Sequence, residues 1–155
     1  MVIVAICLIS TLSFVIKDII VKVQNNNLTY YYVFNEVVIT GGYGDEIVIP
    51  EFIDGREVVK IANKAFYGNV NLKSITISEG VEEIGSLAFS NCSNLTEITI
   101  PSSVVDFSSG VFMRCKNLKT VIFSKGVTEI HFGAFEHCSS RSDSSAFSCA
   151  RFSLI

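Results

Sequence analysis

The chain has 155 residues, enough for a single domain, and its 12 basic and 15 acidic side chains give it a formal net charge of −3. This acidic balance argues against a protein that binds nucleic acid through a broad basic surface, and we expect no nucleic-acid partner. Hydrophobic residues make up 49% of the chain and charged residues only 17%, a composition that excludes an intrinsically disordered protein.

Residues 1–16 form an apolar leader without a charged side chain. As a helix this leader would span about 24 Å, less than the ~30 Å hydrocarbon core of a bilayer. It therefore suits the hydrophobic region of a signal peptide, and Thr11 and Ser13 supply the small residues of a cleavage site. Because no Lys or Arg precedes the run, three alternatives stay open: an uncleaved membrane anchor, a buried strand, or the remnant of a longer protein.

We expect residues 17–57 to form a linker and an N-terminal β cap, with the stretch 24–34 as a linker that enters a hairpin. Gly41, Gly42 and Gly44 have the composition of a phosphate-binding loop, but such a loop has to open a helix. An acidic pair and an apolar strand follow here, so the glycines predict a hairpin turn instead. Asn27 begins an N-glycosylation acceptor motif, which a eukaryotic secretory route would use.

From residue 58 the sequence repeats with a period of 23 residues, which indicates a stacked repeat architecture. Residues 58–140 hold four copies, the last incomplete. Six positions of the repeat recur in phase; the aromatic one is occupied by Phe66, Phe89, Phe112 and Phe135.

Each repeat contains the pattern L-x-x-I-x-I, whose alternation predicts a short strand. Residues 86–92 predict one helical turn with Ala88, Phe89 and Cys92 inward. A single unit cannot bury its apolar face alone, so equivalent strands should pair in parallel and equivalent side chains should stack in columns. We expect the recurring asparagines to form a buried hydrogen-bonded ladder: Asn71, Asn94 and Asn117.

Three motifs in fixed order, V-x-x-I-G at 81–85, A-F-x-x-C at 88–92 and L-x-x-I-x-I-P at 95–101, resemble the BspA-like leucine-rich repeat, the repeat of the surface antigen BspA. The resemblance covers residues 30–140. It implies a right-handed solenoid of short parallel strands and short helical turns with an N-terminal β-hairpin cap. It also implies adhesion or protein recognition at the cell surface or outside the cell, without catalysis. An intracellular, cytoplasmic scaffold and a truncated copy without independent function are the alternatives.

Cys92, Cys115 and Cys138 recur in one column of the repeat. Parallel inward side chains have the wrong dihedral angle for a disulfide. A zinc site needs ligands arranged around a point, whereas these cysteines lie along a line. We therefore expect buried reduced thiols. With Cys7 in the leader and Cys149 in the tail, no C-x-x-C pair and no disulfide framework is present in the sequence.

Only two histidines are present, His131 and His137. His137 should point outward and Cys138 inward, so the two do not form a metal pair. We therefore predict no catalytic residue, no metal site and no cofactor, and we expect that the protein is not an enzyme.

The outward positions of the strands are the candidate partner-binding residues, a strip rich in hydroxyl groups: Ser74, Thr76, Glu97, Thr99, Thr120 and Ile122. At ~4.8 Å between strands and ~3.3 Å per residue, three strands of about seven residues cover roughly 300 Å². A specific interface needs about 800 Å² per partner. We therefore expect a protein or glycan ligand that is bound weakly by each copy.

The fourth repeat departs from the pattern, because Arg141 stands where the core needs Leu. A buried, unpaired guanidinium is costly, so we predict an irregular Ser-rich tail over 141–155. The strand at 118–124 would then be a sheet edge, and its outward Ile122 would promote self-association at the C-terminal end.

Overall fold

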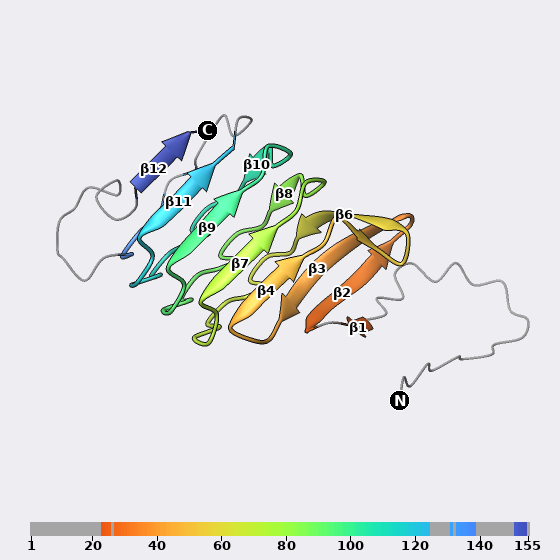
Figure 1. Ribbon diagram of the computed structural model, residues 1–155, viewed down its shortest axis with the longest axis horizontal. Helices are drawn as coiled ribbons and strands as arrows, with labels where there is room; N and C mark the ends of the chain where they lie inside the picture. The colour runs from red at the N-terminus through yellow and green to blue at the C-terminus, as the bar shows by residue number, and fades with distance from the viewer. Residues whose placement is uncertain (1–22, 26, 125–130, 132, 139–150, 155) are drawn as a thin grey trace, which may run out of the picture.

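The computed structural model describes residues 23–25, 27–124, 131, 133–138 and 151–154. Within these residues the chain forms twelve strands and no helix. The strands belong to two sheets, and the chain passes from one sheet to the other as it winds along the stack (Figure 1). No helix within the described ranges has the length and apolar character needed to cross a bilayer. The apolar leader lies outside them.

The five-stranded sheet carries the strands that the repeat predicts, and all neighbouring strands in it are parallel. Glu97 pairs with Ser74 on one side and with Thr120 on the other, which confirms the 23-residue register. Its strands follow the order β12-β11-β9-β7-β4: β4 (Glu46–Ile49), β7 (Ser74–Ile77), β9 (Glu97–Ile100), β11 (Thr120–Phe123) and β12 (Arg151–Leu154).

The seven-stranded sheet lies behind it and begins at the N-terminal end of the stack. The strands β3, β6, β8 and β10 are parallel, whereas β1, β2 and β5 pair antiparallel with their neighbours. The members of this sheet are β1 (Val23–Asn25), β2 (Leu28–Val33), β3 (Glu36–Gly42), β5 (Phe52–Ile53), β6 (Arg56–Ile61), β8 (Glu83–Ile84) and β10 (Asp106–Phe107).

Between the sheets the core is built from columns of equivalent side chains. The rings of Phe66, Phe89, Phe112 and Phe135 stack in sequence, with centroids 5.3, 5.5 and 5.4 Å apart. All four rings are buried. The predicted phenylalanine column is therefore confirmed, because each coil covers the apolar face of the one before it.

The predicted helical turn at 86–92 is a run of tight turns instead. The amides of Ala88, Ser90 and Cys92 donate to carbonyls three residues earlier in the chain, whereas the alternate amides donate to the next coil, as Phe89 does to Val111 O at 2.9 Å. Leu87 and Asn91 have positive φ angles of 58° and 62°, which interrupt a helix. Hydrogen bonding between coils therefore takes the place of hydrogen bonding within a helix.

The N-terminal region differs from the expected linker. Leu28 and Tyr30 are buried in β2, which pairs antiparallel with β3. The glycines do not close a hairpin of their own, because the strands on either side of them, β3 and β4, belong to different sheets. At Gly42 the chain passes so close to Asn27 that a Cβ would lie 2.7 Å from its carbonyl oxygen. The glycines therefore serve close packing at a corner between the sheets.

The prediction for the C-terminal end was wrong for residues 151–154, because β12 pairs in parallel with β11. A 23-residue spacing would pair Thr120 with Asp143, but Thr120 pairs with Arg151. Phe152 and Leu154 take the register positions of Val121 and Phe123, the buried residues of β11. Strand β11 is therefore not a sheet edge, and the proposed self-association through its outward Ile122 loses its basis. Arg141 lies outside the described residues.

Candidate recognition surface

The structure places all six candidate residues on adjacent strands of the five-stranded sheet. Two rows cross β7, β9 and β11: Ser74, Glu97 and Thr120 form one row, and Thr76, Thr99 and Ile122 form the other. We call these six residues the outer strip. In parallel strands in register, such positions share one face of the sheet.

Burial along the strands shows that the outer strip faces away from the core. Thr76, Glu97 and Thr99 are exposed, and the other three members are half-buried. The intervening Ile75, Ile98 and Val121 are buried. The outward alternation of β9 does not continue to Pro101, which is buried. This proline follows the end of β9 at a turn, where its carbonyl accepts the amide of Val104 at 3.3 Å.

Strand β4 extends both rows, which sequence reasoning missed. Glu46 pairs with Ser74, and Val48, whose exposed fraction is 62%, pairs with Thr76. The signal was present, since Glu46–Pro50 reads EIVIP and Glu97–Pro101 reads EITIP. On the opposite side, Arg151 and Ser153 of β12 continue the rows in register next to Thr120 and Ile122.

Charge on this surface is sparse. At the edge of the sheet where the strands begin, Lys73 Nζ lies 3.1 Å from Asp45 Oδ2. This hydrogen bond from Lys73 holds the pKa of Asp45 below its usual range. The rows themselves offer hydroxyl groups, two exposed carboxylates at Glu46 and Glu97, and apolar contacts. Such a surface can exchange hydrogen bonds with a polar ligand, and within the described residues no group of three or more His, Cys, Asp or Glu side chains could hold a metal.

The side chains of Cys92, Cys115 and Cys138 are buried thiols, which confirms the prediction made for them. Each thiol also donates to the carbonyl of the phenylalanine one coil earlier; the Sγ–O distances to Phe66, Phe89 and Phe112 are 3.1, 3.0 and 2.8 Å, respectively. Burial raises the pKa of Cys92 to about 12. The cysteines therefore link consecutive coils through neutral S–H groups.

The predicted buried asparagine ladder was wrong, because Asn71, Asn94 and Asn117 are exposed. Asn94 still bridges two coils from the outside, where its Nδ2 donates to Val70 O at 2.7 Å. Each asparagine lies in the turn before a strand and directly precedes a buried leucine.

The outward orientation predicted for His137 is confirmed. His131 and His137 are exposed, and Cys138 is buried beside them in the chain. His137 Nε2 lies 3.3 Å from Glu136 Oε1. Asn27, the first residue of the glycosylation motif, is exposed, and its modification stays a prediction.

A search of curated proteins found no significant match to this sequence. Two solved structures share 29% sequence identity with the chain. The leucine-rich repeat protein of T. pallidum has a TM-score of 0.58, over 76% of this chain and 67% of that one. The leucine-rich repeat protein of Bacteroides ovatus ATCC 8483 has a TM-score of 0.69, over 75% of this chain and 33% of that one. The present chain thus aligns with only a third of the B. ovatus protein.

A third structure, a leucine-rich repeat protein from Bacteroides capillosus ATCC 29799, shares 19% identity and the fold, with a TM-score of 0.64 over 85% of this chain and 98% of that one. The model of the BspA type leucine-rich repeat region matches residues 45–152 in six copies. This range begins before the periodic segment and includes all of β4 and the first two residues of β12. The chain belongs to the family of proteins with BspA-type leucine-rich repeats.

Proposed function

We propose that this chain is a recognition module, displayed at the cell surface or secreted, which binds a protein or glycan ligand on the outer strip. Leucine-rich repeats of this family typically form protein-interaction modules and not enzymes. The observation that carries the proposal is the register: six outward residues of three strands lie in two continuous rows.

The chemistry of these rows fits a polar, extended ligand. Threonine and serine hydroxyls both donate and accept hydrogen bonds, so they match the hydroxyl groups of a glycan or the amides of a peptide. Val48 and Ile122 lie on either side of Thr76 and Thr99 in the same row. They supply apolar contacts on either side of the hydroxyl groups.

The size of the surface limits the affinity. The sheet has five strands of four residues each, which at ~4.8 Å between strands and ~3.3 Å per residue cover only about 300 Å². This area is below the ~800 Å² per partner of a specific interface. Binding by a single copy is therefore weak, no tighter than micromolar. Tight attachment requires many copies that act together, or further repeats in a longer protein.

The binding part of the proposal is tested on arrays of extracellular proteins and glycans, probed with the full chain. We expect a ligand that the wild type binds and that Thr99→Arg loses, because an arginine in the centre of the outer strip blocks both rows. Glu57→Arg, an exposed substitution on β6 of the other sheet, is the control and should keep that ligand. Loss of the ligand in the control and retention in Thr99→Arg would contradict the proposal.

The location is tested separately, on intact cells that express the tagged full chain. External protease should remove the tag from intact cells, or the tag should be recovered from the medium. Digestion only after the cells are opened would contradict surface display and would favour the intracellular scaffold.

A further inference from the structure

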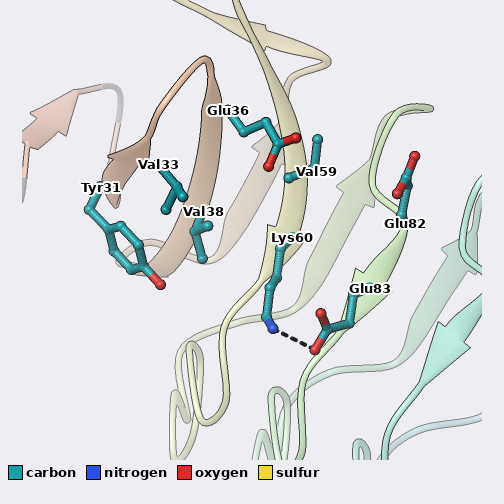
Figure 2. A pocket seen from close by; sticks show the side chains of 8 residues that line it. All are labelled: Tyr31, Val33, Glu36, Val38, Val59, Lys60, Glu82 and Glu83. Atoms are coloured by element: carbon teal, nitrogen blue, oxygen red, sulfur yellow. Dashed lines mark ion pairs between the residues drawn. The ribbon is translucent and has the colours of Figure 1, made fainter. Parts of the chain in front are cut away.

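The seven-stranded sheet carries a shallow groove on its outward side, away from the outer strip (Figure 2). Its volume is about 370 Å³, at the lower end of the range of ligand sites. Strands β2, β3 and β6 and the segment around β8 contribute the lining residues: Tyr31, Val33, Glu36, Val38, Val59, Lys60, Glu82 and Glu83.

A β-bulge shapes the groove. Val37 of β3 pairs with Val58 of β6, but Val38 pairs with Lys60, so Val59 is an extra residue in β6. Bulges bend a strand and redirect its side chains, and they are over-represented near functional sites. Val59 and Lys60, which are consecutive in the chain, both line the groove.

The lining combines an apolar part with an excess of negative charge. Tyr31, Val33, Val38 and Val59 provide the apolar surface. The lining contains three glutamates and one cation, Lys60, whose Nζ lies 2.6 Å from Glu83 Oε1. Glu36 and Glu82 are exposed and have no ion-pair partner within the described residues, so two carboxylates remain without a compensating charge.

An exposed aromatic residue adjoins the groove. Phe34 directly follows the lining residue Val33 in the turn between β2 and β3, and its exposed fraction is 99%. Its φ angle of 52° lies in the left-handed region, which disfavours a bulky side chain. Exposed aromatic residues are typical anchors of protein interfaces, so this position offers an apolar contact next to the acidic groove.

We propose that this groove is a second docking site, which takes a lysine or arginine side chain that a partner protein presents beside an apolar residue. The aliphatic stem of the basic side chain lies along the valines, and its cation lies near Glu36 and Glu82. The apolar neighbour contacts Phe34. Since the two sheets face outward in opposite directions, a ligand on the outer strip and this basic segment can be bound at the same time.

The test uses the full ¹⁵N-labelled chain and the peptide acetyl-Leu-Arg-Leu-amide, with acetyl-Leu-Gln-Leu-amide as the matched neutral peptide. We expect saturable chemical-shift changes in β3, β6 and β8 with the arginine peptide, and none that saturate with the glutamine peptide. The double substitution Glu36→Gln/Glu82→Gln should weaken binding about fivefold, as two partly solvated ion pairs are lost. Phe34→Ala should weaken it as well.

Glu51→Gln/Glu136→Gln is the control, because it removes the same charge from exposed positions outside both the groove and the outer strip and should leave the peptide affinity unchanged. Equal binding of the two peptides, an unchanged affinity in Glu36→Gln/Glu82→Gln, or shift changes confined to the five-stranded sheet would overturn the proposal. Spermidine that binds as tightly as the arginine peptide would also overturn it, since the groove would then attract cations without recognising a protein segment.

Discussion

Phe89 is the residue on which the packing of the stack depends most clearly. Its ring is fully buried between those of Phe66 and Phe112, at centroid distances of 5.3 and 5.5 Å. Phe89→Ala removes a ring from the middle of the column and leaves a cavity, so we expect a loss of about 3–5 kcal/mol in the free energy of unfolding. Denaturant titration measures this loss.

Phe34→Ala is the matched control, because this phenylalanine is 99% exposed. Its truncation should change the free energy of unfolding by no more than about 0.5 kcal/mol. Equal midpoints for wild type and Phe89→Ala would show that the phenylalanine column does not hold the coils together.

The burial of Cys92 predicts that its thiol is alkylated slowly in the native protein. Burial raises the pKa of its thiol to about 12, so almost no thiolate is present at pH 8, and the thiolate is the reactive form. Iodoacetamide should leave Cys92 unmodified in the native protein and should alkylate it in urea. Peptide mass spectrometry separates this residue from the other cysteines. Rapid alkylation of Cys92 under native conditions would show that the coils open far more often than their packing implies.

At the scale of the element, Glu79 joins two consecutive coils after the strands β7 and β9. Its carboxylate accepts the amides of Ser102 and Ser103 at 3.2 and 3.0 Å and the hydroxyl of Ser102 at 3.1 Å. Partial desolvation raises the pKa of Glu79, but these hydrogen bonds outweigh it and leave the pKa below its usual value. The carboxylate therefore stabilises the fold above the pKa of the unfolded chain, and this contribution is lost as the pH falls through the folded-state pKa.

Thermal unfolding between pH 6 and pH 3 tests this link between coils. The melting temperature of the wild type should fall more over this range than that of Glu79→Gln, which lacks the titrating group. Glu97→Gln changes an exposed carboxylate on the outer strip and should keep the pH dependence of the wild type. Identical pH profiles for wild type and Glu79→Gln would refute a stabilising role for this carboxylate.

The register of β12 against β11 predicts how two substitutions in β12 affect the pairing of these strands. Leu154 pairs with Phe123, a buried position, whereas Ser153 pairs with Ile122 of the outer strip. Leu154→Asp introduces a charge at the register position of the buried Phe123, so it should release β12 and speed amide exchange in β11. Ser153→Asp introduces the same charge at the register position of Ile122 and should have little effect. Fast exchange of β11 amides already in the wild type would contradict the pairing.

Over the whole molecule, the sequence predicts those features that the 23-residue period repeats. The phenylalanine column, the buried thiols and the three strands β7, β9 and β11 follow from it, because equivalent residues meet equivalent neighbours in each coil. The same argument brings the six residues of the outer strip to one face.

The 23-residue period does not predict pairs of strands whose partner residues lie more than 23 residues apart in the chain. Glu46 pairs with Ser74, where a 23-residue spacing would give Asn69, so the first coil of the five-stranded sheet falls outside the periodic segment. The last coil shows the same irregularity at Arg151. Sheet pairing depends on the apolar alternation within each strand and tolerates loops of unequal length.

The period also does not specify the direction of a side chain or the shape of a surface. The asparagine position recurs in three of the four copies, as a buried position would, and yet Asn94 is exposed. The groove on the seven-stranded sheet depends on the bulge at Val59. A bulge results from the pairing of two strands, so it cannot be predicted from residue composition.

A substitution scan of the displayed full chain tests the central claim most directly, with the library sorted once for surface expression and once for capture of the ligand recovered from the arrays. Substitutions that lower capture and leave expression unchanged should gather at the outward positions of β4, β7, β9 and β11, with Thr76, Thr99 and Ile122 among the most sensitive. If such substitutions gather instead on the seven-stranded sheet, or at no common face, the outer strip is not the surface through which this solenoid recognises its ligand.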